Sequence, residues 1–400
     1  MPHPWSARVI IAAAGIAAAA CTTPPPDTGP AGPLPAATLP GWRSDTLEGA
    51  ADMIARQCAL ASPPAPWPGL CAEFAALPAD ALPADALPAD ALPAQGLRTW
   101  LESRFDAWAL RDERGGSQGL ITGYYEPLLT GSRTRESDLQ VPLYARPPDL
   151  LTVDLSAVEP KLAGMRLRGR LQGERVVPYH SRAQIENALP LTGNELLWVD
   201  DRIDAFFLEI QGSGRVRLRD GTLVRVGYAD QNGHPYRAIG RSLIDRGALQ
   251  PSEVSAPAIK GWLRDNPAQA AQVMQSNPSQ VFFRELPPAP PTVPGRTEPG
   301  PPGSLGVPLT PERSLAVDRA VVPLGSLVFV DTEHPVTAAP IRRVMGAQDT
   351  GGAIAGQVRA DYFWGFGPEA ERAAGLMKAR GRLWVLWPKG QAFPAAARPR

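Results

Sequence analysis

The chain has 400 residues, of which 46 are proline and 38 are glycine, so about a fifth of it favours turns and interrupts helices. Lysine plus arginine and aspartate plus glutamate both number 40, and this zero net charge argues against a protein that coats nucleic acid or another polyanion. The hydrophobic share of 44% excludes a uniformly disordered chain, and the length predicts two or three domains.

The first 20 residues predict an export signal rather than part of the fold. An apolar run, Val9 to Ala20, follows Arg8 and is about half as long as the roughly 20 residues that a membrane span requires. Its end, Ala-Ala-Ala-Cys21, resembles a bacterial lipobox, in which Cys21 becomes the acylated N-terminus; Thr22 after it is typical of lipoproteins of the outer membrane. The alternative is an ordinary signal peptide cut near Cys21. The proline-rich residues 21–44 predict an extended tether.

Two further cysteines, Cys58 and Cys71, form an even pair once Cys21 is acylated. In an oxidising compartment such a pair is a candidate disulfide, here across a short proline-rich loop. Two buried free thiols are the alternative.

The N-terminal third predicts helices and an inert loop. Residues 45–76 have helical periodicity, and a Leu-Pro-Ala-Asp-Ala repeat that begins at Leu77 matches neither helix nor strand, which predicts a surface loop without chemistry. Residues 100–110 predict an amphipathic helix with Trp100, Phe105 and Trp108 on one face, followed by a strand over 120–125.

The middle of the chain, residues 141–228, predicts strands. Alternation on both sides of Asp220-Gly221 predicts a hairpin, and residues 196–210 predict a second strand pair that turns at Asp200-Asp201. This composition suits a small β-barrel or sandwich.

Helical periodicity returns over residues 237–275 and ends before a strand at 281–283. The proline-dense residues 287–302 predict a loop, and residues 305–387 predict a second β region. The chain is therefore expected to be mainly β with some α.

Common catalytic signatures are absent from the sequence. There is no His-Glu-x-x-His or Cys-x-x-Cys, the four histidines are scattered, and no phosphate-binding glycine pattern follows a strand, so neither a metal nor a cofactor is expected. Gly212-Ser213-Gly214 lacks the spacing of a serine nucleophile elbow.

Three aspartates of the C-terminal β region are the candidates for chemistry: Asp318, Asp349 and Asp361. Gly351-Gly352 after Asp349 allows close approach of a ligand, and the aromatic residues after Asp361 would desolvate its carboxyl group, which raises the pKa. The alternative is structural: Asp349 would cap a turn, and Asp361 would pair with Arg359 or another arginine.

These aspartates belong to a series of segments that together resemble the membrane-bound lytic murein transglycosylase A family between residues 119 and 387. The segments are Thr122–Pro127, Val141–Tyr144, Phe207–Gly214, Tyr228–Arg237, Gln275–Phe283, Gly306–Thr310 and the three aspartate segments. The Leu-Pro-Ala-Asp-Ala repeat and the 287–302 loop depart from the family pattern and lie outside these segments.

The resemblance implies a double-psi β-barrel catalytic domain, formed by residues 45–127 and 230–388, with a second β-barrel domain inserted at 128–229 and a groove between the two. Residues 389–400 would form a loose tail.

The resemblance also implies a reaction on peptidoglycan. The bond between N-acetylmuramic acid and N-acetylglucosamine is cleaved without water, with Asp361 catalytic and Asp349 and Asp318 supporting it. Since the substrate supplies its own hydroxyl nucleophile, one carboxyl suffices, whereas ordinary glycosidases use two. Candidate contacts to the sugars are Tyr125, Gln211, Ser213, Gly214 and Tyr228, although the tyrosines are equally compatible with a core position and the glycines with close strand packing.

Two alternatives stay open: a murein hydrolase that uses two aspartates, and a non-catalytic lipoprotein that binds the cell wall. The expected partners are peptidoglycan glycan strands, outer-membrane lipid through the acyl anchor and murein synthase complexes, with no nucleic acid. The expected state is a monomer anchored in the outer membrane and facing the periplasm.

Overall fold

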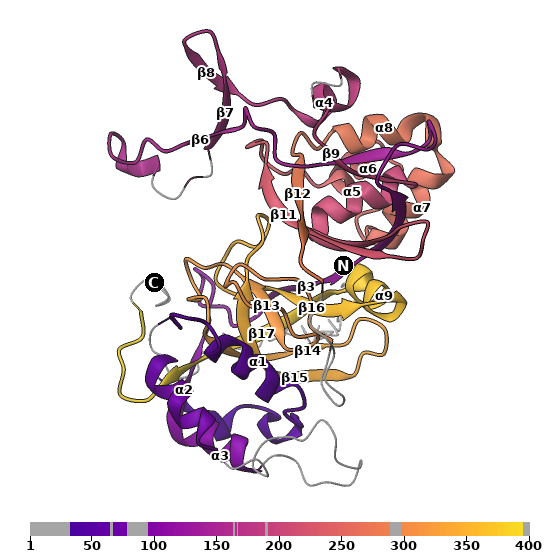
Figure 1. The fold of residues 1–400 in the computed structure, drawn as a ribbon. Coiled ribbons are helices and arrows are strands. Elements are labelled where there is room, and N and C mark those ends of the chain that lie inside the picture. Colours follow the sequence, from indigo (N-terminus) through magenta and orange to yellow (C-terminus); the bar gives the residue numbers. More distant parts are fainter. Residues whose placement is uncertain are drawn as a thin grey trace, which may run out of the picture.

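The computed structural model describes residues 33–64, 67–77, 95–162, 165, 167–188, 191–288 and 298–394 (Figure 1). The signal segment, Cys21, much of the tether, most of the Leu-Pro-Ala-Asp-Ala repeat and the last residues of the tail lie outside these ranges. Within them, no helix has both the length and the hydropathy needed to cross a membrane.

The first sheet has eight strands, and six of them close into a barrel because β3 pairs with both β16 and β17. The strand order is β1 (Leu34–Pro35), β2 (Phe105–Ala109), β17 (Lys378–Pro388), β14 (Leu327–Glu333), β15 (Pro340–Asp349), β13 (Ser314–Val317), β16 (Arg359–Phe366) and β3 (Gly119–Glu126). The barrel thus combines one strand from the N-terminal third with five from the C-terminal region.

Strand β14 shows why this barrel is apolar on both faces. Val328 and Val330 point into the barrel, whereas the alternate residues Leu327 and Phe329 point outward against a second cluster of buried side chains. That cluster is supplied by the N-terminal segments η1 (Ala36–Thr38), η2 (Trp42–Ser44), α1 (Ala50–Cys58), α2 (Trp67–Ala75) and α3 (Gln95–Arg104). In Figure 1 these indigo and purple helices lie beneath the barrel.

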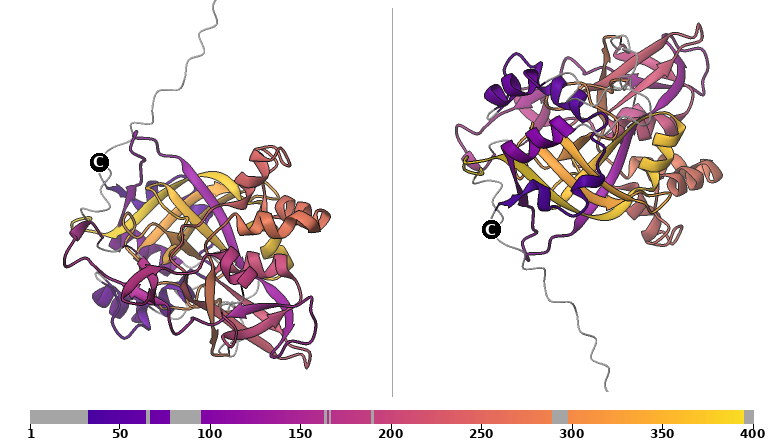
Figure 2. Two further views of the ribbon diagram at one scale, coloured as in Figure 1. Left: turned by 90° about the horizontal axis from the view of Figure 1, so that it is seen from above. Right: turned by 90° about the horizontal axis from the view of Figure 1, so that it is seen from below.

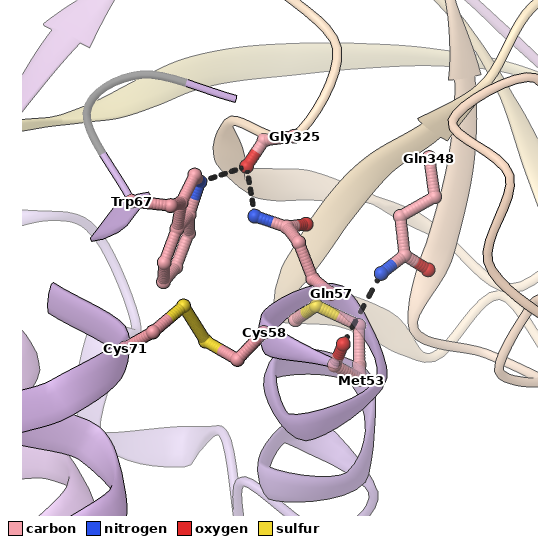
Figure 3. The surroundings of a disulfide bond; sticks show 7 residues. All are labelled: Met53, Gln57, Cys58, Trp67, Cys71, Gly325 and Gln348. Carbon is pink, nitrogen blue, oxygen red and sulfur yellow. Dashed lines mark hydrogen bonds between the residues drawn. A yellow bond between two sulfur atoms is a disulfide. The ribbon is translucent and has the colours of Figure 1, made fainter. Parts of the chain in front are cut away.

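A disulfide bond between Cys58 and Cys71 joins α1 to α2 (Figure 3). Beside it, Gln57 Nε2 and Trp67 Nε1 both donate to the carbonyl oxygen of Gly325, at 2.5 and 2.6 Å. The cystine links the two helices to each other, and the two hydrogen bonds hold them against the loop before β14.

The second sheet has six strands in the order β12 (Val281–Leu286), β11 (Leu223–Gln231), β10 (Ser213–Arg217), β4 (Leu128–Ser132), β9 (Glu195–Val199) and β5 (Val141–Tyr144). A bridge between Ala145 and Phe283 brings its first and last strands together, so this sheet is also barrel-like. The predicted hairpin at Asp220-Gly221 is confirmed, with Gly221 at φ 86°.

The remaining elements flank the second sheet. A separate three-stranded sheet projects from it in Figure 1, made of β6 (Leu151–Val153), β7 (Leu167–Gln172) and β8 (Arg175–Pro178). The helices of this half are η4 (Pro160–Leu162), α4 (Arg182–Ala188), α5 (Arg202–Gln211), α6 (Ile239–Asp245), α7 (Ala256–Asp265) and α8 (Pro267–Gln275). In both views of Figure 2, the salmon-coloured helices α6 to α8 project on one side of the molecule.

Two predicted elements were wrong. The helix predicted over 100–110 ends at Arg104, and Phe105–Ala109 forms β2, because these residues pair with β17 and bury alternate side chains. The strand pair predicted over 196–210 is one strand followed by helix α5. Asp201 begins that helix by accepting hydrogen bonds from the amides of Ile203 and Asp204, so it is a helix cap rather than a turn residue.

The expected end of the inserted domain, at residue 229, divides elements that pack together. Strand β12 pairs with β11, and helices α6 to α8 share a buried cluster with Phe206 and Phe207 of α5. We therefore propose that the insertion extends to about Leu286.

Helix α9 (Pro368–Leu376) packs closely on the barrel at Gly123 of β3. A Cβ atom at Gly123 would lie 2.6 Å from Trp364 Nε1 and 3.0 Å from the Cα of Ala374, so any side chain there would push the helix away.

Candidate functional site

Strand register places Asp349 and Asp361 on either side of Ala316. Ala316 of β13 pairs with Asp349 of β15 in parallel and with Asp361 of β16 in antiparallel orientation. Since neighbouring strands lie about 4.8 Å apart, the backbones of the two aspartates are roughly 10 Å apart. Leu315 and Tyr362 belong to the barrel interior, so their neighbours Ala316 and Asp361 face outward.

A β-bulge produces this alignment. The register between β13 and β15 shifts after Leu315 and skips Gln348, whose side chain is fully buried instead. Gln348 Oε1 accepts from Ser314 Oγ at 2.6 Å, and its Nε2 donates to the Met53 carbonyl at 3.2 Å. The bulge thus re-aims Asp349 toward the outer face of β13, as bulges beside active sites often do.

The Asp361 carboxyl is bound by one hydroxyl group. Thr122 of β3, which pairs directly with Asp361, donates from Oγ1 to Asp361 Oδ1 at 2.6 Å. Burial raises the pKa of Asp361 to about 6; the Thr122 hydrogen bond and Arg359 oppose the shift, and the nearby Asp349 adds to it. A carboxyl with this pKa can both donate and accept a proton near neutrality.

Asp349 has more hydrogen bonds. Its Oδ1 accepts from the amide and hydroxyl of Ser304, both at 2.9 Å, and from the amide of Thr350 at 2.8 Å, while its Oδ2 accepts from the Tyr124 hydroxyl at 3.1 Å. Burial raises its pKa, although these hydrogen bonds favour the ionised form. Burial, together with both aspartates, raises the pKa of Tyr124 well above its ordinary value, so Tyr124 is a neutral hydrogen-bond donor.

A small apolar cluster surrounds the aspartate pair on the outer face of the barrel. Tyr124 and Phe363 contact each other with ring centroids 5.1 Å apart, and Leu309, Ala316 and Ile354 complete the cluster. These side chains contribute to the burial that raises the pKa of Asp361. Of the aromatic residues that follow Asp361, Phe363 is in this cluster, whereas Tyr362 and Trp364 belong to the barrel interior.

Asp318 has a different environment. Its Oδ1 accepts from the amide of Ala320 at 3.0 Å, and its Oδ2 from the amide of Gly356 at 2.8 Å. It therefore ties the turn after β13 to the loop between β15 and β16. Its contacts are those of a residue that holds the site's loop in place.

The predicted sugar-binding residues lie in varied positions. Tyr125 is in the barrel core and donates to Glu371 at 2.9 Å, so its ring offers no face to a sugar. Gln211 ends α5 and accepts from the amide of Tyr125 at 3.0 Å, while Ser213 and Gly214 are buried on β10. Only Tyr228, with 38% of its surface exposed, has substantial exposed area.

Three residues of the site were not predicted: Thr122, Tyr124 and Ser304. The first two are two positions apart on β3, so they share a face, and the strand prediction could have grouped them. Ser304 follows a proline-rich loop and carries no sequence signal for its contact with Asp349.

Comparison with known proteins identifies two regions. Residues 120–284 match the family described as the MltA specific insert domain, and residues 313–387 match the 3D domain. The second region contains all three candidate aspartates, and the first contains Thr122 and Tyr124.

Curated proteins and solved structures that match most of the chain point to the same family. The chain is 32% identical, over 70% of its length and 69% of the relative's, to membrane-bound lytic murein transglycosylase A of Escherichia coli K12. Among solved structures it resembles MltA of Neisseria gonorrhoeae, with 35% identity, a TM-score of 0.74, and coverage of 90% of this chain and 93% of that one. It also resembles E. coli MltA with bound chitohexaose, with 31% identity, a TM-score of 0.57, and coverage of 71% and 76%.

Proposed function

This chain belongs to the membrane-bound lytic murein transglycosylase A family and is an enzyme that acts on peptidoglycan, and we propose that Asp361 is the single acid and base of its reaction. The reaction cleaves the β-1,4 bond between N-acetylmuramic acid and N-acetylglucosamine and forms 1,6-anhydromuramic acid. The observation that carries the proposal is the buried Asp361 carboxyl, whose pKa burial raises to about 6.

In the first step, protonated Asp361 gives its proton to the glycosidic oxygen as the bond between that oxygen and the anomeric carbon of muramic acid breaks. In the second, the muramoyl 6-hydroxyl oxygen attacks the same carbon, and its proton passes to the Asp361 carboxylate. Asp361 ends protonated as it began, and no water is consumed. The 6-hydroxyl is already held near the carbon by the sugar ring, which lowers the entropic cost of the attack.

Asp349 has a supporting role in this scheme. Its negative charge, on the other side of Ala316, favours the protonated form of Asp361 before the reaction. Its four hydrogen bonds favour the ionised form of Asp349 itself, so the two carboxyl groups are suited to different tasks.

The substrate is expected to be an extended glycan strand, since a relative of similar fold binds chitohexaose. Gln211, Ser213 and Gly214 stay candidates for sugar contacts through backbone groups or after rearrangement, and Tyr228 is the candidate for stacking. The groove between the two barrels stays a prediction.

Replacement of Asp361 by Asn tests the catalytic assignment. The Asp361→Asn variant cannot donate the proton, so turnover of purified murein should fall at least about 1,000-fold while the protein stays folded. Asp138→Asn, at a side chain that is 98% exposed, is the matched control and should retain full activity.

Mass spectrometry of the wild-type digest tests the reaction class in the same experiment. Anhydromuropeptides are expected, whereas free reducing ends would indicate a hydrolase that uses a second aspartate. Near wild-type turnover by Asp361→Asn would refute the assignment.

The names of the relatives support membrane association. We further propose that an acyl chain on Cys21 anchors the protein, as a monomer, in the outer membrane and facing the periplasm, where murein synthase complexes are candidate partners. Fractionation of cells tests the anchor: a Cys21→Ser variant should move from the membrane to the soluble periplasmic fraction. Retention of this variant in the membrane would contradict acylation at Cys21.

A further inference from the structure

The Thr122 hydroxyl group, which donates to Asp361, also accepts a hydrogen bond from Arg359. Arg359 Nη2 donates to Thr122 Oγ1 at 2.9 Å, and Thr122 Oγ1 donates to Asp361 Oδ1 at 2.6 Å. An arginine has no acceptor atom, so the lone pair of Thr122 faces Arg359, and the one hydroxyl proton of Thr122 has Asp361 as its partner. The direction of both hydrogen bonds is therefore fixed.

Strand pairing holds Arg359 in position for this contact. Arg359 lies two residues before Asp361 on β16 and pairs with Leu120, two residues before Thr122 on β3. Its Nη1 donates to the carbonyl oxygens of Ala360 and Leu120, at 2.5 and 3.3 Å. The half-buried guanidinium group thus has partners on both strands, and its orientation does not depend on Asp361.

We propose that Arg359 is a positioning residue that acts on Asp361 through Thr122, and that this arrangement makes Oδ2 of Asp361 the oxygen that carries and donates the proton. The inference rests on the proposed function of Asp361. It goes beyond that function because it assigns a role to each carboxyl oxygen of Asp361. It also adds Thr122 and Arg359 as the residues that determine these roles.

The two carboxyl oxygens of Asp361 differ in their partners. Oδ1 already accepts a hydrogen bond from the Thr122 hydroxyl, whose proton points at it. A proton bound to Oδ1 would face the Thr122 proton and repel it. Oδ2 has no hydrogen-bond partner among the described residues, which leaves it able to bind the proton and present it to a substrate oxygen.

The charged and titratable groups around Asp361 act in opposite directions. Burial, the largest effect, and Asp349 raise the pKa of Asp361, whereas the Thr122 hydrogen bond and the Arg359 charge lower it. Tyr124, on the adjacent strand β3, is neutral because its own pKa is well above the ordinary value. Loss of either Thr122 or Arg359 should therefore raise the pKa of Asp361.

A double-mutant cycle tests whether Arg359 acts through Thr122. The full-length protein is compared with Thr122→Val, Arg359→Met and the double variant, and the alkaline limb of kcat/KM for murein cleavage is measured against pH. Each single change should move that limb upward by roughly half a pH unit or more. The Arg359 charge also acts on Asp361 directly, so if Arg359 acts through Thr122 as well, the shift in the double variant should be smaller than the sum of the two single shifts.

Conservative and distant variants serve as controls. Thr122→Ser keeps the hydroxyl group and should keep the wild-type pH profile, whereas a merely structural role for Thr122 would give similar losses in both variants. Arg372→Met removes an exposed arginine on α9 and should leave the profile unchanged.

Titration of the Asp361 carboxyl by carbon-13 NMR, with its signal identified by absence from Asp361→Asn, gives the same pKa values without any reliance on activity. Shifts that add fully in the double variant would show that Arg359 acts on Asp361 by its charge alone and would overturn the inference, as would an unchanged pKa in Thr122→Val. If Thr122→Val does not fold, Arg359→Met alone should still raise the carboxyl pKa, and no rise would overturn the inference. An active Asp361→Asn would instead refute the proposed function, so the two failures are distinguishable.

Discussion

At the scale of single residues, the burial that raises the pKa of the Asp361 carboxyl costs the protein stability. Its pKa rises from an ordinary 3.8 to about 6 in the fold, chiefly through burial. A carboxyl with a raised pKa contributes stability that is fully present below about pH 3.8 and is lost as the pH rises through about 6. Above pH 7, the folded protein therefore holds a buried negative charge that the unfolded chain would solvate.

This cost predicts that loss of the charge stabilises the protein. Asp361→Asn should raise the free energy of unfolding at pH 8 by up to about 3 kcal/mol, because the amide keeps an acceptor for Thr122 and carries no charge. At pH 3.5 the gain should vanish, since Asp361 is then neutral in both states. Thermal unfolding at both pH values measures the difference. The exposed Asp138→Asn should change little at either pH, and an equal gain for Asp361→Asn at both would contradict the prediction.

Local sequence features, the glycines after Asp349 and the aromatic residues after Asp361, made both aspartates candidates, but only the family resemblance assigned them roles. The sequence did not identify Thr122, which is 239 positions away from Asp361. The sequence also could not show whether Tyr124 or Tyr125 lies at the site. Successive residues of a strand point to opposite faces, and the sequence does not show which of the two faces of β3 is turned toward the barrel interior. The tyrosine at the site is Tyr124, and Tyr125 is in the core.

At the scale of secondary-structure elements, a buried ion-pair network joins the two sheets. Glu126, at the end of β3, is fully buried and accepts from Arg215 of β10 at 2.8 and 3.0 Å. Arg215 also pairs with Glu298, which follows the return from β12, and lies over the Phe366 ring of β16 at 4.0 Å. One arginine thus contacts the strands where the chain leaves the barrel and the segment where it returns.

We expect removal of Arg215 to be strongly destabilising. Arg215→Met leaves the Glu126 carboxylate buried with Arg225 at 3.7 Å as its remaining cation, which should cost about 3–5 kcal/mol of unfolding free energy. Arg219→Met is the matched control: this arginine also contacts two carboxylates, but it is 52% exposed and should cost less than about 1 kcal/mol. Chemical denaturation of both variants provides the comparison, and equal losses would show that burial of the network is unimportant.

Most elements were predictable where local signals agreed, as at the hairpin around Asp220-Gly221. The errors arose where pairing between distant segments of the chain determined the secondary structure. Phe105–Ala109 continues a helical pattern in the sequence. It forms a strand because it pairs with β17. The apolar residues after Asp201 fit strand or helix, and only the cap contact of that aspartate distinguishes them.

At the scale of the whole molecule, family resemblance and topology contributed different information. The local patterns predicted the mainly β class and the resemblance implied the two-barrel organisation, both of which agree with the sheets. The extent of the insertion depends on β12, a strand that follows three helices in sequence and pairs back to β11. Nothing in the local pattern of residues 281–286 indicates which of the two barrels this strand would join.

The closure of the first barrel has a consequence for when the enzyme becomes active. Asp349 and Asp361 lie near the C-terminus, Thr122 lies before the insertion, and β17, which ends at Pro388, joins β14 to β3. Contacts of such sequence separation form late and slowly in folding. A chain clipped before residue 378 lacks the closing strand and cannot complete the site. The topology therefore makes the site depend on the integrity of the whole chain, because the barrel is complete only when its last strand is in place.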